Sequence, residues 1–217
     1  MTKKVAVILS GCGVYDGAEI YESTLTLLAL DQAGVHYQCM APNILQHHVV
    51  NHLNGEEMPE KRNVLVEAAR IARGNILDLA KANPADYDAL IIPGGFGAAK
   101  NLSSFAFKGA EMTVQPDVLK FVQAIHNAGK PVGLVCIAPA MAPLLFGPGT
   151  ECTIGNDPDT AAAVEAMGGA HQNCAVDDIV IDEKRKVVTT PAYMLANRLS
   201  EANMGISKLV NAVLKLA

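Results

Sequence analysis

The sequence places one cysteine where an apolar run ends and small residues begin. In residues 133–140 (GLVCIAPA), Cys136 follows a stretch of strand character and precedes an Ala- and Pro-containing stretch. This order is typical of a nucleophile elbow, in which a sharp strand-to-helix turn presents a nucleophile above the sheet. The amides that open the helix, beginning with Ile137 N–H, are then free to donate to an oxyanion. We expect the positive end of the helix dipole to favour the thiolate.

The ionisation of the thiol decides whether such a cysteine is reactive. A thiol of ordinary pKa, about 8.5, is only a few per cent ionised near neutrality. Lowering the pKa by about two or three units makes the thiolate the major species. The alternative interpretation of Cys136 is a buried apolar residue at a strand end. Cys12, in a glycine-rich loop after the first expected strand, is the second candidate nucleophile. Three cysteines are interpreted as structural: Cys39, Cys152 and Cys174.

Length and composition indicate one well-buried domain. The chain has 217 residues, of which 50% are apolar and 18% charged, a balance typical of an α/β domain with a large core. We therefore expect a single domain over residues 1–217. The net charge of −5 argues against a nucleic-acid partner, which requires a concentrated basic surface.

Cysteine usage and the N-terminal residues bear on where in the cell the protein is located. Five dispersed cysteines with no Cys-x-x-Cys pair argue against a disulfide framework and against a zinc knuckle. The apolar run after Lys3 and Lys4 is too short for a signal peptide or a membrane span. These features predict a cytoplasmic protein without a membrane partner.

Apolar runs of strand length alternate with segments of helical period. We expect strands over residues 4–10, 36–41, 87–93 and 131–135, a hairpin over 178–181 and 187–190, and helices over 20–33, 62–73, 114–128, 159–167 and 193–217. This alternation predicts an α/β fold with a mostly parallel sheet covered by helices on both faces. Residues 94–97 (GGFG) are expected to form a tight turn. Residues 43–63 lack clean periodicity and are interpreted as an excursion that carries a short hairpin.

Several segments resemble a known family. Residues 93–102 (PGGFGAAKNL), followed by the Cys136 elbow, resemble the ThiJ/PfpI superfamily, whose members are relatives of class I glutamine amidotransferase domains. Residues 5–22, 62–74 and 177–196 narrow the resemblance to the glyoxalase ElbB family. The resemblance spans essentially the whole chain, including the excursion.

The resemblance implies a fold and an activity. The implied fold is a flavodoxin-like three-layer sandwich, commonly a homodimer. The implied activity converts small aldehydes of the glyoxal type to 2-hydroxy acids, for example glyoxal to glycolate. This enzyme, a lyase independent of glutathione, requires no cofactor and no metal.

The resemblance also implies roles for individual residues. The nucleophile of the family falls on Cys136, and its partner carboxylate falls on Glu22. Glu19 lies one helical turn earlier on a similar face and competes with Glu22 for this role. The oxyanion and substrate-binding positions fall on Gly95, Ile137, Glu19 and Asn101.

The histidines depart from the pattern of many relatives. Such relatives carry a catalytic His directly after the Cys or after the elbow helix; here these places hold Ile137 and residues 156–157. A Cys–His peptidase or amidase is therefore disfavoured. His47, His48 and His52 lie close in sequence, but no acidic or thiol partner has ligand-like spacing, so we expect no metal site.

Other function classes remain as alternatives. One is a cysteine-based oxidative-stress sensor or chaperone-like protein without significant turnover, because an accessible low-pKa cysteine beside a carboxylic acid can oxidise to a sulfinate. Another is a glutaminase-like subunit, which the missing His disfavours. A third is a dinucleotide-binding domain, suggested by Gly11 and Gly13, but the third glycine is misplaced at Gly17.

Overall fold

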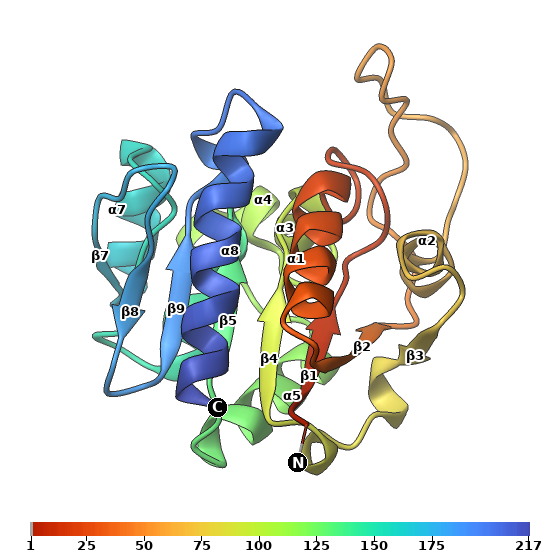
Figure 1. The fold of residues 1–217 in the computed structure, drawn as a ribbon. Coiled ribbons are helices and arrows are strands. Elements are labelled where there is room, and N and C mark those ends of the chain that lie inside the picture. Colours follow the sequence, from red (N-terminus) through yellow and green to blue (C-terminus); the bar gives the residue numbers. More distant parts are fainter. Residues whose placement is uncertain (1) are drawn as a thin grey trace.

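A seven-stranded sheet runs through the middle of the protein in the computed structural model, which describes residues 2–217 (Figure 1). The strands are β1 (Lys4–Ile8), β2 (His36–Ala41), β3 (Ile76–Asp78), β4 (Ala89–Ile92), β5 (Val132–Val135), β8 (Val180–Asp182) and β9 (Val187–Thr190). Their order is β3-β2-β1-β4-β5-β9-β8, and every pair is parallel except β8 with β9. The carboxyl ends of six neighbouring strands therefore lie along one edge, where β1, β4 and β5 are central.

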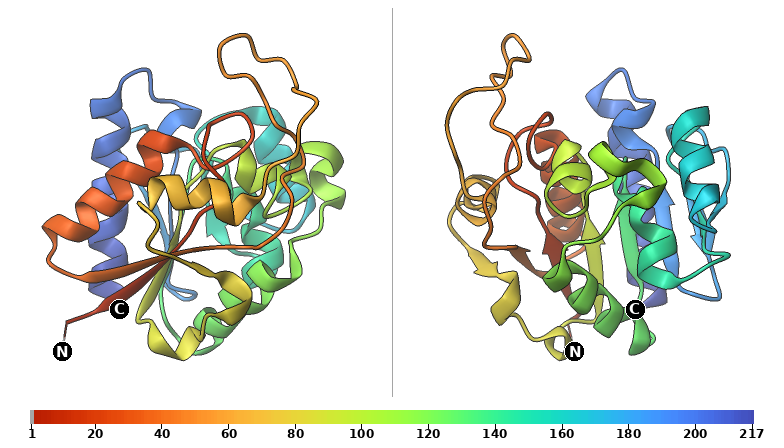
Figure 2. Two further views of the ribbon diagram at one scale, coloured as in Figure 1. Left: turned by 90° about the vertical axis from the view of Figure 1, so that its right-hand side faces the viewer. Right: turned by 180° about the vertical axis from the view of Figure 1, so that it is seen from behind.

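Helices cover both faces of this sheet (Figure 2). One face carries α1 (Ile20–Gln32), α2 (Val64–Ile71) and α8 (Leu199–Leu216). The other face carries α5 (Pro116–Asn127) and α6 (Ala142–Phe146). The shorter elements are α3 (Phe96–Lys100), α4 (Phe105–Lys108), α7 (Pro158–Ala166) and the two-stranded pair β6 (Glu151–Cys152) and β7 (Ala170–His171). No helix within residues 2–217 is long and apolar enough to cross a membrane.

The apolar run of β1 shows why the sheet is buried on both sides. Successive side chains of a strand point to opposite faces. Val5 and Val7 pack into the core under α1, α2 and α8, whereas Ala6 and Ile8 pack into the core under α5 and α6. All four side chains are fully buried. The prediction of a mostly parallel sheet between two helical layers is confirmed.

Three elements differ from the expectations. Residues 94–97 do not form only a turn, because α3 begins at Phe96. The expected helix over residues 193–217 is divided into a short 3-10 turn at Ala192–Met194 and α8, which begins at Leu199. Strand β3 was not predicted, since three residues at the edge of a sheet carry no measurable periodicity.

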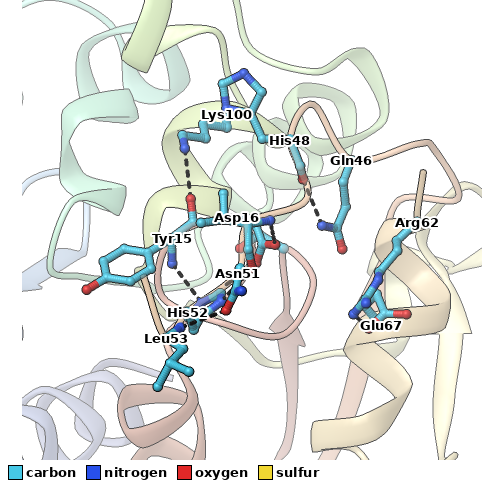
Figure 3. A network of polar contacts seen from close by, with 12 residues as sticks. Tyr15, Asp16, Gln46, His48, Asn51, His52, Leu53, Arg62, Glu67 and Lys100 are labelled. Atoms are coloured by element: carbon cyan, nitrogen blue, oxygen red, sulfur yellow. Dashed lines mark hydrogen bonds and ion pairs between the residues drawn. The ribbon is translucent and has the colours of Figure 1, made fainter. Parts of the chain in front are cut away.

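The excursion over residues 43–63 folds over the loop between β1 and α1 (Figure 1). It contains the expected hairpin, with an antiparallel bridge between Val50 and Glu57. Val50 N–H donates to Asp16 Oδ2 at 2.7 Å. Tyr15 N–H donates to His52 Nε2 at 3.1 Å (Figure 3). The His52 ring also stacks on the Tyr15 ring. These contacts hold the loop that leads into α1.

Candidate active site

Cys136 occupies a strained turn directly after β5. Its φ is +64°, in the left-handed region that residues with a side chain rarely adopt. Its N–H donates to Thr190 O at 2.9 Å, so the strained residue is fixed to the end of β9. A single turn of 3-10 helix over Ala138–Met141 follows, and then α6 begins. The strand-to-helix bend expected at Cys136 is therefore present, and its backbone is held in a conformation that costs energy.

Glu22 lies against the Cys136 thiol. This residue sits in the first turn of α1 and is fully buried. Its carboxylate oxygens accept the N–H of Gly94 at 3.0 Å and the N–H of Tyr193 at 3.1 Å, and the carboxyl is hydrogen bonded to Cys136. Burial, assisted by the nearby Glu19 carboxyl, raises the pKa of Glu22 to about 7. A carboxyl with this pKa exchanges its proton near neutral pH.

Gly94 allows these two side chains to meet. A Cβ at this position would lie 2.4 Å from the Cβ of Cys136 and 2.6 Å from Oε2 of Glu22. Both distances are shorter than those seen for a real Cβ. Any residue other than glycine at position 94 would therefore require Cys136 or Glu22 to move. The Pro-Gly-Gly turn after β4 thus determines how closely the carboxyl approaches the thiol.

Two backbone amides also face the sulfur of Cys136. The N–H groups of Gly95 and Ile137 donate to Sγ, which favours a negative charge there. Burial and the Glu22 carboxyl act more strongly in the opposite direction and raise the pKa of the Cys136 thiol well above its ordinary value. The expectation of a dipole-stabilised thiolate is therefore wrong. The structure provides only one 3-10 turn and one short helix behind the sulfur, too little to offset desolvation.

Glu19 occupies a different position from Glu22. It is the N-cap of α1, and its Oε2 accepts the N–H of Glu22 at 2.6 Å. Its side chain is nearly buried, and burial raises the pKa of its carboxyl. Glu19 lines a cavity, whereas Glu22 lies behind the sulfur of Cys136. The geometry therefore pairs Glu22 with the thiol and exposes Glu19 to a bound molecule.

The cavity at this edge of the sheet has a volume of about 300 Å³. Six residues from distant segments define its chemical character: Glu19, Phe105, Cys136, Ile137, Thr160 and Tyr193. Sequence reasoning missed Phe105, Thr160 and Tyr193 as site residues. Tyr193 lies in the segment that carried the family resemblance, but nothing in the local sequence marks Phe105 or Thr160, because only the packing of α4 and α7 brings them to the cysteine.

Asn101 is placed differently from the expectation. It was expected to bind substrate, but its Nδ2 donates to Ser10 O and to Asp16 O, both at 2.9 Å. Its Oδ1 accepts the N–H of His47 at 3.0 Å. The side chain is 6% exposed and does not line the cavity. Asn101 instead braces the loop after β1 and the start of the excursion, since all its donors are used internally.

The clustered histidines of the excursion take part in packing. His47 lies against the Phe107 ring with centroids 3.9 Å apart, and His52 stacks on Tyr15. Within residues 2–217, no three His, Cys, Asp or Glu side chains are grouped to hold a metal ion.

A strained cysteine at the carboxyl edge of a parallel sheet, backed by a buried carboxyl, defines an elbow-type α/β protein of flavodoxin-like fold. The comparison with known families agrees. Residues 3–192 match the family model described as the DJ-1/PfpI family, and the chain belongs to that family. The resemblance to the ThiJ/PfpI superfamily is thus confirmed.

Individual relatives extend the likeness over nearly the whole chain. The chain is 45% identical to the human "Glutamine amidotransferase-like class 1 domain-containing protein 3, mitochondrial", over 98% of this chain and 83% of the relative. It is equally similar to the rat "ES1 protein homolog, mitochondrial", over 98% of this chain and 84% of the relative. A solved structure of an "isoprenoid biosynthesis protein with amidotransferase-like domain" from Ehrlichia chaffeensis has a TM-score of 0.93 and 37% identity, covering 99% of both chains.

These relatives correct one prediction. The expected cytoplasmic location is contradicted, because the human and rat relatives are named mitochondrial proteins. The prediction relied in part on unpaired cysteines, which indicate a reducing environment but do not distinguish one reducing compartment from another.

Proposed function

We propose that this DJ-1/PfpI protein is a cofactor-independent glyoxalase that converts 2-oxoaldehydes to 2-hydroxy acids, glyoxal to glycolate in the simplest case. The observation that carries the proposal is the contact between the Cys136 thiol and the Glu22 carboxyl beside a cavity of about 300 Å³. The resemblance to the glyoxalase ElbB family supports the same reaction.

The first step is addition of the sulfur to the aldehyde carbon. A thiol of raised pKa needs an adjacent base, and a carboxylate with a pKa of about 7 is suited to that task. The proton of Cys136 passes to Glu22 as the carbon–sulfur bond forms. The aldehyde oxygen takes up the electron pair of the broken π bond. The N–H groups of Gly95 and Ile137, which already face the sulfur, stabilise this oxyanion until it takes up the proton from Glu22 and becomes a hemithioacetal.

The second step moves hydrogen from the former aldehyde carbon to the neighbouring carbonyl carbon. The first carbon is thereby oxidised to a thioester, and the second is reduced to an alcohol. Water then attacks the thioester, which releases the 2-hydroxy acid and returns the Cys136 thiol. Because one carbon loses the electron pair that the other gains, the reaction requires no external oxidant or reductant.

The proposal is tested by following carbon-13-labelled glyoxal by NMR in deuterated water. The wild-type protein is expected to produce glycolate, and Cys136→Ser is expected to produce none above background. Deuterium at the alcohol carbon would indicate that hydrogen moves as a proton, and its absence would indicate a hydride shift. Cys174→Ser is the matched control, since this free cysteine lies away from the cavity. Equal turnover by Cys136→Ser would rule out the proposal.

A second candidate function uses the same atoms. Two amides and a carboxyl around Sγ also suit a sulfinate, so the cysteine is a candidate oxidative-stress sensor. The raised pKa of the buried thiol opposes rapid oxidation, whereas in the enzymatic proposal the Glu22 carboxylate removes the proton as the sulfur adds to the aldehyde. Complete oxidation of Cys136 at a low dose of peroxide, with no turnover of any 2-oxoaldehyde, would favour the sensor.

A further inference from the structure

The cavity beside Cys136 has no positively charged wall. No Lys, Arg or His is found among the described residues that line it. Glu19 contributes a carboxyl, and the hydrogen bond from the Glu22 amide to Glu19 Oε2 holds that carboxyl in place at 2.6 Å. The backbone N–H groups at the start of α1 favour its ionised form against the effect of burial. A ligand carboxylate entering this space would lose its water without gaining a cationic partner, and it would approach Glu19.

Lys100 does not supply the missing cation. Its ammonium group donates to Tyr15 O at 2.8 Å and lies 5.2 Å from the centroid of the Phe96 ring. Its ammonium group is therefore engaged by these partners, and Lys100 does not line the cavity.

A second acidic group lies behind another wall of the cavity. The Thr160 hydroxyl donates to Asp157 Oδ2 at 2.5 Å, and Thr160 N–H donates to the same oxygen at 2.9 Å. These bonds lower the pKa of Asp157, so its carboxyl is ionised at neutral pH. Because its proton is directed to Asp157, the Thr160 hydroxyl is not free to donate to a ligand carboxylate.

Most of the remaining lining is apolar, and Tyr193 adds an aromatic ring that carries a hydroxyl group. Val14, Phe96, Phe105, Ala106 and Met194 line the space. Its volume of about 300 Å³ lies at the lower end of the ~300–1,000 Å³ range of ligand pockets. Glyoxal, the smallest 2-oxoaldehyde, has no substituent to contact these walls. A substituent the size of one aromatic ring would contact them and exclude water.

We propose that this cavity selects uncharged 2-oxoaldehydes that carry an apolar, ring-sized substituent and rejects those that carry a carboxylate, with Glu19 as the residue that sets the charge selectivity. The reaction in this statement rests on the proposed function. The class of ligand can be measured without turnover.

The kinetic test compares an uncharged substrate with an analogue that carries an added carboxylate, and Glu19→Gln separates the effect of its charge from that of its size. Phenylglyoxal is paired with para-carboxyphenylglyoxal, and glyoxal is the reference for size. Wild-type kcat/KM is expected to be about 30-fold or more higher for phenylglyoxal than for its carboxylate analogue, the effect typical of an unpaired buried charge. It is also expected to be about 10-fold or more higher for phenylglyoxal than for glyoxal. Glu19→Gln, whose amide oxygen still caps α1, is expected to reduce the ratio of kcat/KM for phenylglyoxal to kcat/KM for its carboxylate analogue at least about threefold. Glu183→Gln, an exposed residue outside the cavity, is expected to leave it unchanged.

The binding test requires no reaction. The rate of Cys136 alkylation by iodoacetamide is measured with benzyl alcohol or with para-(hydroxymethyl)benzoate present. The neutral ligand is expected to protect the thiol and the carboxylate is not, and Glu19→Gln is expected to reduce this difference. Protection by the neutral ligand alone, without turnover of any 2-oxoaldehyde, would refute the glyoxalase proposal but support the ligand class. Equal protection by both ligands in wild type and Glu19→Gln, or equal kcat/KM for the charged and neutral substrates, would overturn the inference.

Discussion

The carboxyl of Glu22 lies behind the thiol of Cys136, fixed there by the amides of Gly94 and Tyr193 at 3.0 and 3.1 Å. The two side chains come from the first turn of α1 and from the end of β5. Burial raises the pKa of both groups, so the Cys136 thiol needs the Glu22 carboxylate to accept its proton. In the proposed reaction, exchange of a proton between the two groups supports chemistry near neutral pH.

The activity of the pair should follow the ionisation of Glu22. Its carboxylate form, which accepts the thiol proton, predominates only above a pKa of about 7. We therefore expect kcat/KM for 2-oxoaldehydes to rise with pH through about 7 in the wild-type protein. Glu22→Gln is expected to lose this rise and to lower kcat about 100-fold or more. A pH series of initial rates, with Glu183→Gln as the control, measures both effects. An unchanged profile in Glu22→Gln would show that another group is the base.

Stability should depend on pH through the same carboxyl. The pKa of Glu22 is raised from 4.5 to about 7, so between these pH values the folded protein retains a proton that the unfolded chain releases. The free energy of unfolding should therefore fall as pH rises through this range. As pH rises through this range, the wild-type protein should lose on the order of 3 kcal/mol more of its free energy of unfolding than Glu22→Gln does. Urea denaturation of both proteins at pH 5 and pH 8 measures it, and parallel pH dependences would contradict the assignment.

Gly94→Ala should disrupt the site. The added Cβ meets Cys136 and Glu22 at distances that require one of them to move. We expect a loss of about 1–3 kcal/mol in stability and loss of most turnover. Gly34→Ala is the control, because its φ of +67° strains an alanine while its added Cβ would meet nothing within 4 Å. That control should be destabilised by roughly 1 kcal/mol yet keep full activity. Full activity in Gly94→Ala would show that the close approach is not required.

The strain at Cys136 can be measured directly. Because φ is +64°, glycine should be favoured over alanine at this position. We expect Cys136→Gly to be at least as stable as Cys136→Ala and up to about 1–2 kcal/mol more stable. At Ala138, two residues further along and without positive φ, the change to Gly should instead destabilise by about 0.5–1 kcal/mol. Thermal or urea unfolding of the three variants provides the comparison. A Cys136→Ala variant more stable than Cys136→Gly would argue against a strained elbow.

Asn101→Ala should affect stability more than substrate binding. The change leaves the carbonyls of Ser10 and Asp16 and the amide of His47 without their buried partner. We expect a loss of about 2–4 kcal/mol in the free energy of unfolding and little change in KM for the fraction that remains folded. A strongly raised KM with unchanged stability would restore the substrate-binding role first expected for this residue.

Signals confined to a few neighbouring residues predicted much of the fold. The near-continuous apolar run of β1 indicated a strand buried on both faces, and the structure shows this burial. Gly34, Gly74 and Gly129 lie two or three residues after the ends of α1, α2 and α5, and all three have the positive φ typical of a glycine that ends a helix. The bend at Cys136 was predicted in the same way. Strand β3 was not predicted, because a three-residue edge strand is stabilised by its pairing with β2. That pairing leaves no pattern in the three residues themselves.

The sequence by itself determined the alternation of strands and helices and the position of the cysteine at a turn, because propensity and periodicity act between residues close in the chain. Only the tertiary structure decided that Glu22 contacts the thiol, that Glu19 faces the cavity, and that Asn101 serves as a brace. It also reversed the expected shift in the pKa of Cys136, because desolvation depends on everything packed around the sulfur. Burial and contacts of this kind arise from segments far apart in sequence, and no local pattern records them.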